Sequence, residues 1–154
     1  MLARDAALLA RRLMDIHGLP DWGFSFDRSR RRFGVCNWSA KTIGLSRLLT
    51  ELNDEAHVRD TILHEIAHAL AGRQTGHGRK GREAAVLVGA TPRRCYDRTV
   101  ALPPLPLLLR CPNCGILREA ARRFKRKRSC GRCASRFDPR YLLCVEPNPA
   151  FSQA

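Results

Sequence analysis

Residues 53–72 of the chain, NDEAHVRDTILHEIAHALAG, carry the strongest structural signal in the sequence. Asn53 is a good N-cap residue, acidic side chains follow it at the positive end of the expected helix dipole, and Gly72 is a plausible C-cap. Apolar residues between these ends recur at helical spacing. The stretch therefore predicts a helix over residues 54–71.

The predicted helix contains the motif H-E-x-x-H, formed by His64, Glu65 and His68. At about 100° per residue the two histidines lie about 40° apart in projection and one turn apart, so both imidazoles can bind one metal ion. Zinc lowers the pKa of a bound water from about 15.7 to about 7, and Glu65 can take its proton as the water attacks a carbonyl. The motif predicts the chemistry of peptide hydrolysis; the alternative is two histidines on an ordinary amphipathic helix.

A zinc site of this kind needs a third protein ligand, which is expected after the helix. The candidates are His77, in a glycine-containing loop, and Glu83, on a short helix predicted over residues 82–89. Glu83 would complete a set of two histidines and one glutamate. His77 is favoured because Gly76 and Gly78 on either side allow the backbone to turn it back toward the first helix.

The residues before the H-E-x-x-H helix predict one further helix and a sheet. Apolar residues at positions 2–16 recur at spacings of three and four, which predicts a helix that ends at Gly18. From Trp22 to Ser46, short alternating runs separated by turn residues predict a small antiparallel sheet with a basic turn at residues 27–32. These elements together predict an α+β fold.

The C-terminal part of the chain contains two Cys-x-x-Cys pairs separated by 15 residues. Four thiolates at this spacing can surround a zinc ion tetrahedrally and leave no open position for catalysis. Because the segment has few apolar residues, metal binding would supply most of its folding energy. The pattern predicts a structural zinc ribbon, and its ligands are Cys111, Cys114, Cys130 and Cys133.

A basic run lies between the two cysteine pairs and contains no acidic residue. Its cations could bind phosphates, and its one aromatic ring could stack on a base, so we expect salt-dependent binding of nucleic acid without sequence preference. The alternative is a solvated, charged hairpin. The residues of the run are Arg122, Arg123, Phe124, Lys125, Arg126, Lys127 and Arg128.

The net charge of the whole chain also favours binding of nucleic acid. The 154 residues include 28 Lys and Arg against 14 Asp and Glu, a formal net charge of +14, which favours a polyanionic partner. No run of 18 apolar residues and no signal peptide is recognisable, and paired cysteines suit metal binding in a reducing compartment. We therefore expect an intracellular protein, cytoplasmic or nucleoid-associated, that does not bind membranes.

The sequence resembles the SprT-like family, which includes the Spartan proteases of DNA–protein crosslink repair. The resemblance rests on HEIAHAL, a following HG, a helix that ends in LVGATPRRCYD, and the Cys-x-x-Cys ribbon. The upstream stretch WGFSFDRSRRRFGVCNWSAKTIGLSRLLTELNDE is similar to the family's sheet, so the resemblance covers roughly residues 20–146. One departure is Gly81, where the family usually has an aromatic residue.

The resemblance implies a zincin-like metalloprotease domain over residues 1–98. In this domain His64, His68 and His77 would bind zinc, Glu65 would be the catalytic base, and the substrate would be protein associated with DNA. The predicted order continues with a proline-rich linker at residues 99–109, the basic ribbon at 110–146 and a tail at 147–154.

The predicted function is that of a zinc metalloendopeptidase, with one catalytic and one structural zinc ion, that cleaves DNA-associated or DNA-crosslinked proteins. Glu65 would activate a zinc-bound water for this reaction. An alternative is a zinc-containing nucleic-acid-binding adaptor without proteolytic activity, for example in transcription.

Overall fold

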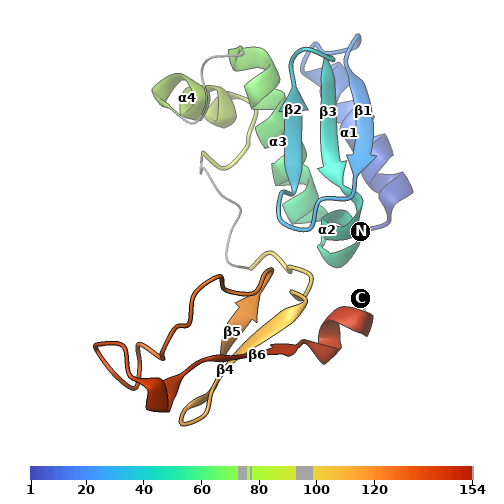
Figure 1. Cartoon of the computed structure of the whole chain (residues 1–154). Coiled ribbons are helices and arrows are strands. Elements are labelled where there is room, and N and C mark those ends of the chain that lie inside the picture. The colour runs from blue at the N-terminus through green and yellow to red at the C-terminus, as the bar shows by residue number, and fades with distance from the viewer. Residues whose placement is uncertain (73–75, 77, 93–98, 154) are drawn as a thin grey trace. The chain divides into compact units, whose positions relative to one another are not determined.

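The computed structural model describes residues 1–72, 76, 78–92 and 99–153, and the chain divides into two units, Met1–Leu102 and Pro103–Ala154 (Figure 1). The division falls inside the segment predicted as a linker. In the part of the chain that the structure describes, no helix is long and apolar enough to cross a membrane.

The first unit is an α+β structure in which helices cover one face of a three-stranded sheet. Figure 1 shows α1 and α3 on the same face, and both contact the sheet. Its large buried side chains come from both layers and include Met14, Ile43, Leu45, Ile62 and Ile66. The elements are α1 (Ala3–Ile16), β1 (Gly23–Asp27), β2 (Gly34–Asn37), β3 (Thr42–Ser46), α2 (Arg47–Leu52), α3 (Glu55–Ala71) and α4 (Arg79–Leu87).

The sheet is mixed, so the prediction of a purely antiparallel sheet was wrong. Its strand order is β1-β3-β2, with β1 parallel to β3 and β2 antiparallel to β3. The chain after β1 does not fold back as a hairpin, because it crosses the end of β3. There Ser46 donates its hydroxyl to Ser29 O (2.6 Å) and its N–H to Phe33 O (2.7 Å), while the Phe33 ring is buried. β2 therefore pairs with the far edge of β3.

The predicted helix over residues 54–71 is confirmed as α3, although its N-cap is Asp54 rather than Asn53. The carboxylate of Asp54 accepts the backbone N–H of His57 (3.0 Å), which satisfies a donor of the first turn. Asn53 instead is the C-cap of α2, a short helix that the sequence did not predict. The second predicted helix, over residues 82–89, begins earlier in the structure, as α4.

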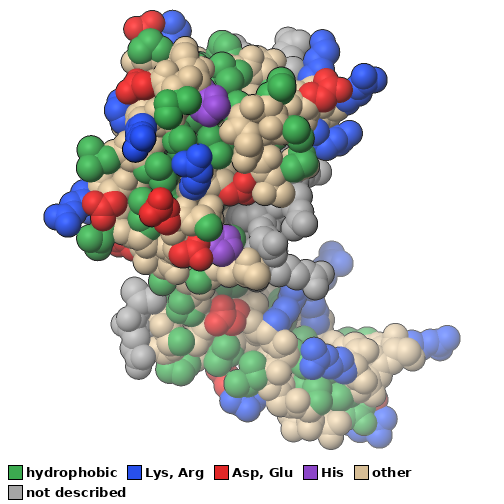
Figure 2. All heavy atoms as spheres, turned by 180° about the vertical axis from the view of Figure 1, so that it is seen from behind, with side chains coloured by type: hydrophobic (Ala, Val, Ile, Leu, Met, Phe, Trp, Pro, Cys, Tyr) green, Lys and Arg blue, Asp and Glu red, His purple; other side chains and the backbone are tan. Residues whose placement is uncertain are grey.

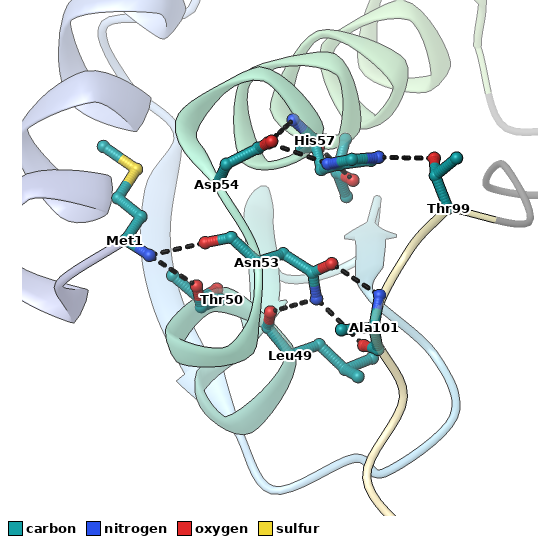
Figure 3. A network of polar contacts seen from close by, with 9 residues as sticks. Met1, Leu49, Thr50, Asn53, Asp54, His57, Thr99 and Ala101 are labelled. Atoms are coloured by element: carbon teal, nitrogen blue, oxygen red, sulfur yellow. Dashed lines mark hydrogen bonds and ion pairs between the residues drawn. The ribbon is translucent and has the colours of Figure 1, made fainter.

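The buried side chain of Asn53 ties residue 101 to the junction of α2 and α3 (Figure 3). Its amide donates to Leu49 O (2.8 Å) and to Ala101 O (3.0 Å), and its carbonyl accepts the N–H of Ala101 (2.7 Å). A second connection runs through the His57 ring, which contacts Asp54 Oδ1 (2.7 Å) and Thr99 Oγ1 (2.9 Å). The last residues of the first unit are thereby held against the start of α3.

Replacement of Asn53 by alanine is expected to lower the free energy of unfolding of the first unit by about 2–3 kcal/mol. The change removes three hydrogen bonds made by a buried side chain, one to Leu49 O and two to the backbone of Ala101, and each such bond contributes about 0.5–1.5 kcal/mol. Urea unfolding of the full chain measures the effect. Asn37→Ala is the matched control, because Asn37 is exposed and its side chain accepts one bond, from Ala40 N. Equal losses in the two variants would contradict the role assigned to Asn53.

The second unit is built on an antiparallel sheet with strand order β5-β4-β6. The central strand contributes Leu109 and Cys111 to a small interior that also contains Cys130. Two parts of the chain differ from the prediction: residues 107–109, expected in the linker, begin β4, and Asn148, expected in the tail, is buried and donates to Leu105 O (2.8 Å). The strands are β4 (Leu107–Cys111), β5 (Gly115–Ala120) and β6 (Cys144–Pro147), with short 3₁₀ helices at Pro139–Tyr141 and Pro149–Gln153.

Candidate metal centres

The two histidines of the H-E-x-x-H motif lie together on α3. Their Nε2 atoms are 3.1 Å apart, and their rings meet edge to face with centroids 4.8 Å apart. Two nitrogens bound to one tetrahedral zinc at about 2.0–2.1 Å would be about 3.3 Å apart. His64 and His68 therefore fit a zinc ion as a ligand pair without rearrangement of the helix.

The end of α3 that carries His68 is held by a tryptophan. Trp38 donates its indole N–H to the backbone carbonyl of His68 (3.1 Å), and its ring packs edge to face against Trp22 at 5.3 Å between centroids. The bond satisfies a carbonyl in the last turn of the helix, where intrahelical donors run out. Trp38 thus supports a candidate ligand through the backbone, a role that the sequence did not indicate.

Glu65 is buried against the sheet, with 7% of its surface exposed. Burial raises its pKa to about 7; the charge of Arg32 and a hydrogen bond donated by the Cys36 backbone N–H act in the opposite direction but offset only part of the effect. A carboxyl group with a pKa near neutral pH is suited to accept a proton and return it. Glu65 therefore has the environment expected of a general base.

Strand β2 shapes the surroundings of Glu65, and sequence reasoning missed its contribution. A Cβ atom at Gly34 would lie 2.7 Å from both Cγ and Oε1 of Glu65, so only glycine leaves room for this carboxylate. The Cys36 thiol nearby is neutral, because burial and the charge of Glu65 raise its pKa to about 11. Nothing in the sequence alone distinguishes Gly34 from an ordinary strand glycine.

The third ligand of the histidine site stays a prediction. His77 lies outside the described residues. Glu83 is described: it lies on the exposed side of α4, and its carboxylate accepts from Arg79 Nε (2.8 Å) in the same helix. Gly81, the position of the family aromatic, is half-buried in α4.

The four ribbon cysteines form one cluster in the second unit. Their sulfur atoms all lie within 4.8 Å of one another, with Sγ to Sγ distances of 3.8 Å for Cys111 and Cys133 and 3.5 Å for Cys114 and Cys130. Sulfurs bound to one tetrahedral zinc at about 2.3 Å would be about 3.8 Å apart. The group could therefore bind a zinc ion, whereas Cys144 is not part of it.

Backbone turns next to the cysteines hold the four sulfur atoms of this cluster together. Gly115 takes a left-handed conformation (φ 80°) directly after Cys114, and in the second knuckle the N–H groups of Cys133 and Ala134 donate to Cys130 O (3.2 and 3.1 Å). Cys114 and Cys130 share a hydrogen bond and shift in opposite directions: burial and hydrogen bonds to the other sulfurs raise the pKa of Cys114, whereas hydrogen bonds from the Arg132 N–H and from Cys114 outweigh burial and lower the pKa of Cys130 to about 7. The thiolate is the form that binds metal, so Cys130 is the sulfur that most readily takes the binding form.

The basic run of residues 122–128 is exposed except for its half-buried phenylalanine. Within residues 103–153, the carboxylates have other partners: Glu146 accepts from Arg110, Asp138 from Arg140, and Glu119 from the backbone N–H of Leu105. The guanidinium of Arg128 lies over the Phe124 ring, 5.1 Å from its centroid, so one ring face is already covered. Figure 2 shows Lys and Arg side chains projecting from the surface of the second unit.

An H-E-x-x-H motif on a helix, as α3 carries it, is typical of metalloprotease-like proteins. The family model described as the SprT-like family matches residues 8–100, and the chain belongs to the SprT-like family. This family is generally linked to zinc metalloprotease-like proteins. Comparison with curated proteins and with solved structures found no match.

Proposed function

We propose that the chain is a zinc-dependent endopeptidase that cleaves proteins bound or crosslinked to DNA. The observation that supports this most is the buried Glu65, held next to a histidine pair whose spacing fits one zinc ion. In this proposal the first unit has a zincin-like core. Its helix α3 presents His64, Glu65 and His68, and the sheet packs against this helix.

His64, His68 and His77 would hold the catalytic zinc. When bound, zinc supplies the acidity of a coordinated water and polarises the peptide carbonyl. Glu65 accepts the proton of the attacking water and returns it to the leaving amine. Its burial serves this step, because a carboxylate that is largely removed from water accepts a proton more readily than an exposed one.

The ribbon would hold the enzyme on DNA through its basic run, while a second, structural zinc ion maintains its fold. Residues 110–154 contain 11 basic and 3 acidic residues, and the run at 122–128 carries cations that no carboxylate within residues 103–153 neutralises. Cations presented in this way bind phosphates without reading bases. The turn at residues 27–32 would add further positive charge, although Arg32 is paired with Asp27. A DNA partner also implies an intracellular location, in the cytoplasm or associated with the nucleoid.

Cleavage of a DNA-bound protein by the zinc-loaded full chain, with and without single-stranded DNA, tests the proposal. We expect DNA to stimulate cleavage. The double variant Arg126→Gln/Lys127→Gln should weaken this stimulation and reduce the salt slope of DNA binding by roughly 1.4, since each phosphate that is no longer neutralised lowers the slope by about 0.7.

The matched control is Arg4→Gln/Arg12→Gln, which removes the same charge from exposed positions on α1. This control should keep the salt slope and the stimulation of the parent. An equal effect of both double variants would show that net charge, rather than the basic run, carries the binding. DNA binding without any cleavage would instead support the adaptor function, for which Gly81 in place of an aromatic residue is the motivating feature.

A further inference from the structure

Glu65 contacts the edge strand β2 at two points. The backbone N–H of Cys36 lies close to the carboxylate. Two residues earlier in the same strand, Gly34 leaves open the volume that Cγ and Oε1 of Glu65 occupy. The strand therefore lies against the carboxylate and leaves room for it.

The requirement for glycine at position 34 is one of space. The backbone of Gly34 is not in the left-handed region, unlike that of Gly72 or Gly115, so its conformation is open to alanine. A Cβ atom there would nevertheless lie 2.7 Å from two atoms of Glu65, a separation at which one of the groups must move. Alanine at this position would thus be compatible with the strand and incompatible with the present place of Glu65.

The rigid side chain of Thr61 limits how the structure can accommodate a Cβ atom at position 34. Its Cγ2 atom would lie 2.8 Å from the same Cβ position, on the preceding turn of α3. Its hydroxyl donates to His57 O (2.9 Å), and a β-branched side chain anchored in a helix has little freedom to rotate. The carboxylate of Glu65 is the end of a longer, flexible side chain. A methyl group at position 34 would therefore displace the carboxylate.

We propose that Gly34 is a positioning residue, which determines where the Glu65 carboxylate sits relative to His64 and His68. The inference rests on the proposed function of Glu65 as the base of a peptidase. A base must lie within hydrogen-bond reach of the proton it takes, and a misplacement of about 1 Å costs roughly 10²-fold in rate. Gly34 acts on the reaction through Glu65 and touches neither substrate nor metal in this account.

The first test compares Gly34→Ala with the parent as zinc-loaded full chains. We expect kcat to fall by roughly 10²-fold while KM and zinc content stay unchanged, because the histidine pair is untouched. Gly44→Ala is the matched control: it lies in β3 of the same sheet, and its Cβ would meet Val35 Cγ1 at 3.0 Å but not Glu65. This control strains the sheet and should keep the kcat of the parent.

Two further measurements separate positioning from a general effect on folding. In a Glu65→Gln background, Gly34→Ala should cause no further loss of kcat, since its effect passes through the missing carboxylate. Crystal structures of both zinc-loaded proteins should show that the Glu65 carboxylate of Gly34→Ala is displaced from its position in the parent. An inactive parent would refute the proposed function, and the crystal structures would still decide the inference. An unmoved carboxylate, a variant with the kcat of the parent, or an equal further loss in the Glu65→Gln background would overturn it.

Discussion

Glu65→Gln is expected to lower kcat for cleavage of a DNA-bound protein by roughly 10²–10⁴-fold, the usual contribution of a general base. Glutamine has nearly the same size and keeps a carbonyl oxygen that can accept hydrogen bonds, but it cannot take up the proton of an attacking water. The fold and the histidine pair should be unaffected. Steady-state cleavage of the same substrate by parent and variant measures the loss.

The zinc content of variants distinguishes the proposed catalytic base, Glu65, from residues that bind the metal. Glu65→Gln should keep both zinc ions per chain, whereas His77→Ala should lose one, as measured by elemental analysis of the purified protein. Glu83→Ala is the control for the third ligand and should keep both, because Glu83 already pairs with Arg79 on the surface of α4. Parent-like cleavage by Glu65→Gln would exclude the proposed mechanism, and equal zinc retention in the other two variants would exclude His77 as a ligand.

The second large effect is expected in the ribbon: Cys130→Ser should lose the structural zinc and unfold the second unit. Cys130 is fully buried within the sulfur cluster, and the unit has few other large buried side chains, among them Leu109. Structural zinc contributes about 10–16 kcal/mol of binding energy in small zinc domains, far more than so small an apolar interior can supply. Loss of amide chemical-shift dispersion for residues of the second unit would report the unfolding.

Cys144→Ser is the matched control for this variant. Cys144 is also a free cysteine of the second unit, but it is exposed and lies outside the cluster. The control should keep its zinc and its spectrum. A folded second unit in metal-free Cys130→Ser would show that the strands are stable without the ion, contrary to expectation.

Features encoded by short stretches of sequence could be predicted. The helix that carries His64 and His68 has its apolar period, its acidic N-terminus and its terminal glycine in consecutive residues, and α3 forms within one residue of the expected limits. The two Cys-x-x-Cys pairs were equally informative, because metal-ligand spacing is a property of the local chain. Their four sulfurs do form one cluster.

Features that depend on distant residues could not be predicted. Alternating apolar residues indicate strands but not their neighbours, and the parallel pairing of β1 with β3 depends on how the chain between β1 and β2 crosses Ser46. The short helix α2 was missed because its main signal is one serine, Ser46, which caps it through Leu49 N (3.1 Å).

The surroundings of Glu65, the candidate base, also depend on distant residues and could not be predicted. Gly34 and Glu65 are 31 positions apart, and only the packing of β2 on α3 brings them together. The stacking role predicted for Phe124 stays a prediction, and the cover that Arg128 places over its ring comes from the fold rather than from composition. Sequence patterns thus identified the chemical groups, whereas their environments required the structure.

Trp38, which binds the carbonyl of His68, has a practical consequence for spectroscopy. The chain contains two tryptophans, Trp22 and Trp38, and they lie against each other in the first unit. Intrinsic tryptophan fluorescence therefore reports on the unit with the histidine pair alone and is silent about the ribbon. Because the Trp38 indole is bonded to a candidate ligand residue, its emission also offers a label-free signal for metal loading at that helix.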